Sequence, residues 1–456
     1  IEQLPTNQDK GDALEVFALA YLATQKQFQV QHIWSHQDVP LSIKQELHLP
    51  SQDMGIDGIY IDIQGHKSAY QVKFRSDRAS LNWADELSPF MGLSDFAHQK
   101  VLFTNSDSIP TVMRDRRNFI SICGHDLDRM DSSDFGRILQ WLQGEQVGFV
   151  PKSPKPHQQE AIDDVIHGLQ SEDRVTAVMP CGTGKTLVAL WVAEKLQSGK
   201  VLVLVPSLAL LRQALHEWMK ETRLDKISIL SVCSDSTVQK GHDDWVIEKC
   251  DLDFPVTTDS QVVTNFLKQE IDATKIVFST YQSSPVVAGG MGETDRFDLA
   301  VFDEAHKTAG RQGTKFSFAL DDEKLPIKKR LFMTATPRHY NINKTNKAGD
   351  HQLFYSMDDG DKYGNLVHQL SFARSIEQEI ICDYRVVISV VTSDEVNDKL
   401  LSQSDVLVGT DLVLARQVAN QIALKRAVEK YQTGKIITFH GQVKSAKSFV
   451  SRGNEG

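Results

Sequence analysis

The sequence predicts an α/β protein in which helices alternate with buried strands, and three observations carry this prediction. An apolar run over 174–179 breaks into a glycine-containing turn and is followed by a helix-forming run over 187–196. Further apolar runs begin at residues 200, 275, 297 and 330, as the strands of a central parallel sheet do. Before them, two shorter runs over 53–63 and 68–74 are separated by a turn and indicate a hairpin.

Length and composition are those of an ordinary globular protein. The 456 residues, 41% apolar and 24% charged, suggest about two to four domains. No uncharged apolar run reaches the roughly 18 residues of a membrane helix, so we expect no membrane partner. The five cysteines show no paired spacing and no signal peptide pattern is present, which favours a cytoplasmic protein without a zinc site. With a net charge of −10, any contact with nucleic acid must come from local basic patches.

The turn after the run at 174–179 has the features of a phosphate-binding loop. Glycines let the backbone curl so that its N–H groups point at a phosphate, and the following helix start adds positive partial charge. Lys185 can reach the β- and γ-phosphates, and the Thr186 hydroxyl can ligate Mg²⁺. We therefore predict that ATP contacts the loop residues Cys181, Gly182, Thr183, Gly184, Lys185 and Thr186.

Two later strand ends complete a nucleotide site. The run that begins at residue 297 ends in Asp303 and Glu304. Asp303 can hold Mg²⁺, and Glu304 can orient and deprotonate an attacking water. The run that begins at residue 330 ends in Thr334-Ala-Thr336. The acidic pair after a strand and downstream of the loop predicts ATP hydrolysis.

The order of these motifs resembles superfamily 2 helicases of the DEAH type. Gln158 precedes the loop, Asp303-Glu-Ala-His306 follows it, and Thr334-Ala-Thr336 comes last. The resemblance implies a RecA-like ATPase domain with a doubly wound parallel sheet. It also implies that Gln158 reads adenine, that His306 couples the acidic motif to the next one, and that an exposed set after the strand at 275 contacts nucleic acid, namely Ser279, Thr280 and Gln282.

The N-terminal part carries a second candidate site. The run over 11–22 predicts a helix, and Glu15 lies close to its apolar face. The hairpin places Asp57 at one end of the first strand, and Gln71 and Lys73 point to the same face of the second. A carboxylate and a second oxygen ligand can hold Mg²⁺, and a lysine can orient or activate water, as phosphodiester hydrolysis requires.

This arrangement resembles the PD-(D/E)xK nuclease core in its Mrr-like variant, in which Gln often stands where Glu is usual. The resemblance implies a restriction-endonuclease-like domain with Asp57 and Gln71 as metal ligands and Lys73 as the catalytic lysine. Glu15 would complete the site. Gln71 is neutral and binds a metal more weakly than Glu would.

The predicted domains are a nuclease domain over 1–148, a Pro- and Lys-rich linker over 149–156, a first RecA-like domain over 157–375 and a partial second one over 376–456. A helix is expected over 370–381, then a strand over 383–390 and a helix over 412–432. The stretch over 435–441 resembles the family's first motif of the second RecA-like domain. Residues 234–272 read as a polar, irregular insertion. No arginine finger is recognised, so we expect a fragment of a longer protein or a truncated one.

The whole pattern resembles the front end of type ISP restriction enzymes and the related type I motor subunits. It implies ATP-driven translocation on double-stranded DNA with Mg²⁺-dependent cleavage, alongside methyltransferase or specificity modules outside this chain. Two alternatives stay open. The Mrr-like domain could bind DNA without cleaving it, in an unwinding or remodelling motor, or the chain could be a regulatory subunit that binds nucleotide without turnover.

Overall fold

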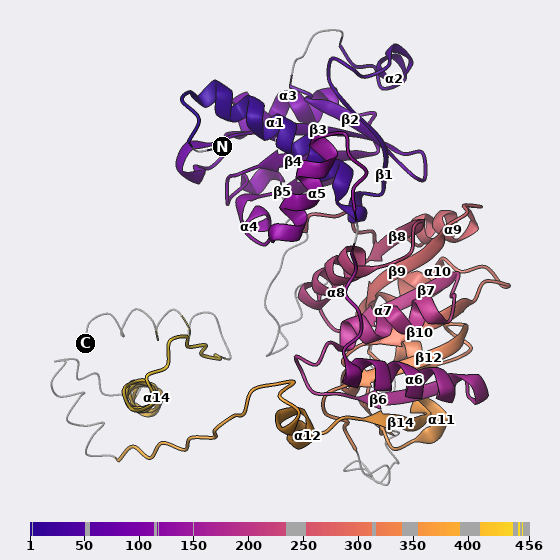
Figure 1. Cartoon of the computed structure of the whole chain (residues 1–456), viewed down its shortest axis with the longest axis vertical. Helices are drawn as coiled ribbons and strands as arrows, with labels where there is room; N and C mark the ends of the chain where they lie inside the picture. The colour runs from indigo at the N-terminus through magenta and orange to yellow at the C-terminus, as the bar shows by residue number, and fades with distance from the viewer. Residues whose placement is uncertain are drawn as a thin grey trace. The chain divides into compact units, whose positions relative to one another are not determined.

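The structure is a computed structural model, which describes residues 1, 3–50, 55–113, 116, 118–148, 150–233, 252–311, 316–339, 354–392, 411–440, 446 and 449. The described residues form two compact units, of which the first runs to Ile381 and the second begins at Cys382. Figure 1 shows the two large sheets of the first unit with their helices. The domain boundaries given above stay predictions.

The N-terminal sheet contains the predicted hairpin and has the strand order β1-β2-β3-β4-β5. Strands β1 and β2 pair antiparallel, as do β2 and β3, whereas β3, β4 and β5 are parallel. The bounds of the strands are Val30–Ser35 for β1, Gly58–Asp62 for β2, Lys67–Lys73 for β3, Gln99–Thr104 for β4 and Phe119–Ile122 for β5.

Both faces of this sheet are covered. One apolar core contains Leu14, Tyr21 and Phe103, and the other contains Ile59, Phe90 and Leu102. The first helix begins after Thr6, whose side chain forms a reciprocal capping box with Asp9. The helices of this part are α1 (Asn7–Thr24), α2 (Leu41–Glu46), α3 (Ser88–Leu93), α4 (Gly124–Leu127) and α5 (Ser132–Leu142).

The second sheet is the parallel sheet that the apolar runs predict, with the order β14-β6-β12-β10-β7-β9-β8. Every pairing in it is parallel. Its strands are β6 (Arg174–Val178), β7 (Lys200–Val205), β8 (Ile227–Val232), β9 (Thr274–Thr280), β10 (Phe297–Phe302), β12 (Ile327–Thr334) and β14 (Asn365–Gln369). Because the strands are parallel, the segments that follow β6, β10 and β12 lie at one edge of the sheet.

Helices pack on both faces of the parallel sheet, since separate apolar cores lie on each side. The helices are α6 (Pro156–Ser171), α7 (Lys185–Lys195), α8 (Leu208–Glu221), α9 (Ser260–Lys268), α10 (Ser284–Gly289), α11 (Gly360–Tyr363) and α12 (Phe372–Glu377). A two-stranded sheet joins β11 (Gly310–Arg311) to β13 (Phe354–Tyr355). Short 3-10 or π turns are η1 (Lys26–Phe28), η2 (Ser76–Arg78), η3 (Trp83–Leu87), η4 (Thr111–Met113), η6 (Tyr281–Ser283), η7 (Ala305–Lys307) and η8 (Phe318–Leu320).

Three expectations need correction. The helix predicted over 370–381 is shorter in the structure, where it consists of α12 alone. The region 234–272 is not uniformly irregular, because α9 and the buried Leu252 and Phe254 belong to it, while 234–251 lie outside the described residues.

The strand predicted over 383–390 is wrong for the part of the chain that the structure describes. Val386 and Ile388 are 78% and 86% exposed, and these residues form no strand. Strands gain stability from pairing with neighbours in a sheet, and α14 (Asp411–Tyr431) offers none. The predicted helix over 412–432 does form, as α14.

Among the described residues, none of the helices combines the length and the apolar character that a membrane crossing requires.

Candidate nucleotide and metal sites

The loop between β6 and α7 depends on two glycines. Gly182 and Gly184 have φ of +84° and +88°, the left-handed region that favours glycine. Gly184 is the N-cap of α7, and a Cβ there would lie 2.3 Å from Gln158 Nε2. Because α7 begins at Lys185, its first free N–H groups point into the loop, as an anion site needs.

Gln158 and His157 support this loop from α6. Gln158 Nε2 donates to the Thr183 carbonyl at 3.0 Å, and a ring nitrogen of His157 lies 3.1 Å from the same oxygen. Gln158 Oε1 accepts from the Lys155 N–H at 2.9 Å. Both ends of the Gln158 amide are thus bonded within the protein, so its visible role is to hold the loop. Adenine reading by Gln158 stays a prediction.

The remaining loop side chains differ in what they can offer a ligand. Cys181 is exposed, and Thr186 is half-buried in the first turn of α7. The buried Thr183 hydroxyl donates to the Pro180 carbonyl at 2.8 Å, which closes the turn. Thr186 is therefore the loop hydroxyl that remains placed to hold Mg²⁺.

Asp303 and Glu304 follow β10 and face the loop lysine. Lys185 Nζ lies 3.7 Å from Glu304 Oε1. Burial, reinforced by the charge of Glu304, raises the pKa of Asp303 to about 6 against the opposing effect of Lys185. Burial also acts to raise the pKa of Glu304, but the hydrogen bond from His306 and the charge of Lys185 outweigh it and leave this pKa below its ordinary value. Glu304 is thereby kept as the ionised base.

His306 connects Glu304 to the motif at the end of β12. Its Nδ1 lies 3.2 Å from Glu304 Oε2 and 2.9 Å from Thr334 Oγ1, and the Thr336 N–H donates to Thr334 Oγ1 at 3.2 Å. These contacts join residues that the sequence analysis assigned to two motifs. They provide a physical path for the predicted coupling.

At the end of β9 and just after it, the predicted exposure of the nucleic-acid-contacting set is wrong for two residues. Ser279 and Thr280 are 0% and 4% exposed, and Gln282 is half-buried. Ser279 Oγ donates to the Thr280 carbonyl, and Thr280 Oγ1 lies 2.8 Å from Ser283 Oγ. These hydroxyls form the turn after the strand and are not available to a nucleic acid in this conformation.

The hairpin brings the two proposed nuclease ligands together. Gly58 pairs with Tyr70 in the antiparallel register, which sets Asp57 opposite Gln71. Asp57 Oδ2 accepts the Val72 N–H at 2.5 Å. Gln71 is 1% exposed, and its Oε1 has no hydrogen-bond partner among the described residues. A buried amide oxygen without a donor fits a ligand for a hard cation, so this pair is suited to Mg²⁺.

Lys73 and Glu15 lie on elements next to this pair. Lys73 is the last residue of β3 and is half-buried. Glu15 is exposed on α1, which packs against β3. Burial raises the pKa of Tyr70, and the charges of Asp57 and Glu15 raise it further, so both carboxylates lie near this ring. The two acids thus belong to one negatively charged region of the N-terminal domain.

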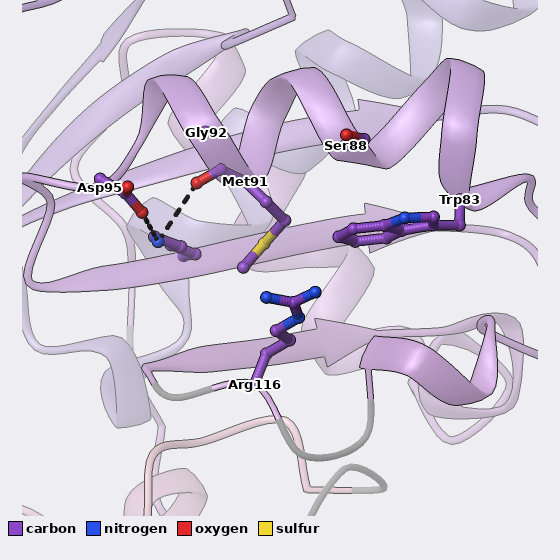
Figure 2. Close-up of a pocket in the computed structure, with 7 residues that line it drawn as sticks. Trp83, Ser88, Met91, Gly92, Asp95 and Arg116 are labelled. Atoms are coloured by element: carbon purple, nitrogen blue, oxygen red, sulfur yellow. Dashed lines mark hydrogen bonds and ion pairs between the residues drawn. The ribbon is translucent and has the colours of Figure 1, made fainter.

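A cavity of about 520 Å³ lies elsewhere in the same domain. Figure 2 shows Arg116 lying over Trp83, with its guanidinium 5.0 Å from the ring centroid. Lys100 Nζ is bonded to Asp95 at 2.7 Å and to the Met91 carbonyl at 3.3 Å. Lys100 lies at the start of β4, whereas Lys73 pairs with the last residue of that strand. The cavity is therefore separate from the Asp57 pair.

Cys123, His125 and Asp126 also present potential metal ligands within 4.8 Å of one another. The carboxylate of Asp126 already has cationic partners, because Arg212 bonds it and Arg129 lies 3.6 Å away. Its other oxygen accepts the Cys123 N–H at 2.9 Å. Guanidinium groups on the shared ligand disfavour a cation here, and we assign this cluster no metal.

Several residues that organise the nucleotide site carry no sequence signal of that role. The Tyr281 hydroxyl donates to the Asp303 carbonyl at 2.7 Å, and Trp218 Nε1 donates to the Thr186 carbonyl at 2.9 Å. Both side chains come from elements distant in sequence, so only the fold brings them to the site.

The family model described as "Type III restriction enzyme, res subunit" matches residues 151–339. The chain is 26% identical over 298 residues to the probable helicase A859L of African swine fever virus (isolate Pig/Kenya/KEN-50/1950), covering 65% of this chain and 30% of the relative. The counterpart from strain Badajoz 1971 is 33% identical over 187 residues, covering 40% and 19%. This chain thus spans less than a third of these relatives' length.

Among solved structures, the chain is similar to the ATP-dependent Type ISP restriction-modification enzyme LlaBIII bound to DNA. The TM-score is 0.66 at 26% identity, over 83% of this chain and 25% of that one. Together these likenesses show a RecA-like helicase fold on a parallel sheet. The chain contains a helicase-like ATPase domain of the superfamily 2 type, related to restriction-enzyme motor subunits.

Proposed function

We propose that this chain is the nuclease and first motor portion of an ATP-dependent restriction enzyme acting on double-stranded DNA in the cytoplasm. The likeness to a DNA-bound Type ISP enzyme over 83% of the chain supports this proposal, since it extends beyond the ATPase domain. The observation that supports the cleavage function is the buried Gln71 Oε1 opposite Asp57, which has no hydrogen-bond partner within the part of the chain that the structure describes. Methyltransferase or specificity modules would belong to the longer protein or complex.

In the ATPase site, bound MgATP would supply the phosphoryl bond that is broken. Lys185 would neutralise phosphate charge, and Thr186 and Asp303 would hold Mg²⁺. Glu304 would accept the proton of the attacking water, a role that fits its lowered pKa. His306 would relay the state of Glu304 to Thr334 through the contacts at 3.2 and 2.9 Å. The phosphate-binding loop and the glutamine that supports it would line the rest of the site, namely Gln158, Cys181, Gly182, Thr183 and Gly184.

In the N-terminal domain, Asp57 and Gln71 would hold Mg²⁺, which supplies charge stabilisation for phosphodiester hydrolysis when bound. Lys73 would orient or deprotonate the attacking water from the end of β3. Glu15 would add negative charge from α1. The neutral Gln71 favours a second candidate function, in which this domain binds DNA without cleaving it, because an amide holds a cation more weakly than a carboxylate.

Nucleotide binding is tested by titrating the chain with a fluorescent ATP analogue in Mg²⁺. We expect Lys185→Ala to weaken binding at least tenfold. Lys195→Ala is the matched control, because Lys195 lies on the same helix and its partner is the exposed Asp163. Equal affinity of the Lys185→Ala and unmodified chains would refute the ATP assignment. DNA-stimulated phosphate release then distinguishes a motor from a regulatory subunit without turnover.

Cleavage is tested by plasmid nicking with Mg²⁺ and ATP. Lys73→Ala is expected to abolish nicking, whereas Lys67→Ala at the other end of β3, paired with Glu46, should leave it intact. Nicking that survives Lys73→Ala would show that the nuclease assignment is wrong. No nicking by either chain, together with retained DNA binding, would favour the binding-only candidate.

A further inference from the structure

Helix α8 of the ATPase domain joins the N-terminal domain through buried charges. The Arg212 guanidinium bonds Asp126 of α4 and lies 3.2 Å from Asp253. Asp126 and Asp253 are 6% and 1% exposed. Arg129 lies 3.6 Å from Asp126 and His216 Nε2 lies 3.0 Å from Asp253, whereas Arg212 contacts both carboxylates. Because buried carboxylates are costly without cationic partners, Arg212 helps to stabilise the place where the two domains meet.

The rest of α8 adds further contacts with the same domain. Lys220 Nζ lies 2.7 Å from Asp131 and 3.1 Å from Asp134, at the start of α5. Just past the end of α8, the Thr222 carbonyl accepts from Lys26 Nζ at 2.9 Å. The N-terminal domain is therefore held at several points spaced along one helix.

The last residue of α8 also holds the linker. Glu221 Oε2 accepts the Lys152 N–H at 2.8 Å, and Glu221 Oε1 lies 2.8 Å from Lys152 Nζ. Glu221 is 5% exposed. The backbone at Lys152 is thus immobilised by α8 itself.

A different side of α8 reaches the nucleotide loop. Trp218 is 1% exposed, and its Nε1 donates to the Thr186 carbonyl at 2.9 Å in the first turn of α7. Its ring packs edge-on against Phe278 at 5.6 Å. Any change in the position of Thr186 must therefore be accommodated by Trp218, because close-packed interiors leave no free volume for it.

We propose that α8 couples the nucleotide site to the N-terminal domain, with Trp218 as the contact to the loop and Arg212 and Lys220 as positioning residues for the domain. This proposal rests on the proposed function, in that ATP is the nucleotide. A helix of 14 residues is about 21 Å long and moves as a unit. Thermodynamic linkage then requires a reciprocal effect. ATP binding changes the free energy of domain docking by the same amount as docking changes the free energy of ATP binding.

Trypsin cleavage after Lys152 measures the docked state directly. The other basic residue of the linker, Lys155, precedes Pro156 and resists trypsin, so Lys152 is the informative site. Cleavage requires that Lys152 leave Glu221. We expect Mg²⁺ with a non-hydrolysable ATP analogue to change this cleavage rate at least threefold in the unmodified chain, and Arg212→Ala to raise it in both states.

The decisive variant is Trp218→Phe, which keeps a smaller aromatic ring in place of the indole and removes the Nε1–H donor. It should bind the analogue and retain the resting cleavage rate but lose the response to nucleotide, an effect that a purely structural role would not produce. Arg212→Lys should restore part of the docking, and Gln213→Ala, an exposed neighbour on α8, should behave as the unmodified chain. If Arg212→Ala does not fold, the half-exposed Lys220→Ala provides the same test.

Two outcomes would overturn the coupling. One is bound analogue with an unchanged cleavage rate in the unmodified chain, and the other is a normal response in Trp218→Phe. Absence of analogue binding, read from fluorescence, would instead refute the proposed function and the coupling with it. The first two results leave nucleotide binding standing, so the two failures are distinguishable.

Discussion

At the scale of single residues, Gly184 is the loop position at which substitution by a residue with a side chain is expected to be most disruptive. Its φ of +88° costs a residue with a side chain about 1–2 kcal/mol. An added Cβ would also displace Gln158 Nε2 from the Thr183 carbonyl. We predict that Gly184→Ala lowers the affinity for an ATP analogue at least tenfold, measured by fluorescence titration.

Gly360→Ala is the matched control, because nothing lies within 4 Å of a Cβ at Gly360 and its φ is not in the left-handed region. It should bind the analogue as the unmodified chain does. Equal affinity in the Gly184→Ala chain would mean that the loop adopts another conformation around nucleotide.

At the scale of elements, β2 depends on close approach of the backbone at Gly58. A Cβ at this residue would lie 2.2 Å from both the Trp34 carbonyl oxygen and the Tyr70 hydroxyl. The Trp34 carbonyl cannot move without disturbing the pairing of β1 with β2, and the Tyr70 hydroxyl donates to this carbonyl at 3.1 Å. We predict that Gly58→Ala destabilises the N-terminal domain by about 1–3 kcal/mol, measured by urea unfolding.

Gly92→Ala supplies the comparison, since Gly92 has open space around its Cα. Its urea midpoint should remain close to that of the unmodified chain. A Gly58→Ala midpoint equal to that of Gly92→Ala would contradict the packing that holds Asp57 in place.

The elements also show how far the sequence can predict this fold. The hairpin and the strand before the phosphate loop were predictable, because alternation and continuous apolar runs reflect burial on one or both faces of a sheet. The strand expected over 383–390 was not, because an apolar run forms a strand only where a neighbour pairs with it. The hydroxyls of Ser279 and Thr280 were expected to be available to nucleic acid. They instead form hydrogen bonds in the turn at the end of β9, which the sequence pattern does not reveal.

At the scale of the whole molecule, the contacts that join the two sheets were outside the reach of sequence patterns. Arg212 and Asp126 are 86 residues apart, and no sequence pattern pairs them. Their pairing depends on contacts between two sheets that lie within one compact unit. The nucleotide loop was predictable because its chemistry lies within a few consecutive residues.

Acid should weaken the contact between α8 and α5. The hydrogen bond from Lys220 lowers the pKa of Asp131 to about 2. Because this pKa lies below the ordinary value of about 4, the pair stabilises the protein above pH 4 and loses its effect as the pH falls toward 2. Asp131 is half-exposed, so the effect is small: Lys220→Ala should lower the melting temperature by about 1–3 °C at pH 7.

The melting temperatures of the two chains should converge as the pH falls from 4 to 2. Comparing unmodified and Lys220→Ala chains at each pH removes the general effect of acid on both. A difference that stays constant from pH 7 to pH 2 would show that the ion pair is not its source.

The backbone at Glu304 has a consequence for anyone who engineers this protein for heat resistance. Glu304 adopts φ 49° and ψ 45°, a left-handed conformation that costs asparagine less free energy than glutamate. Glu304→Asn should therefore raise the melting temperature slightly while it abolishes DNA-stimulated phosphate release. A screen that selects for thermal tolerance alone would favour this inert variant, so durability and turnover oppose each other at this single position.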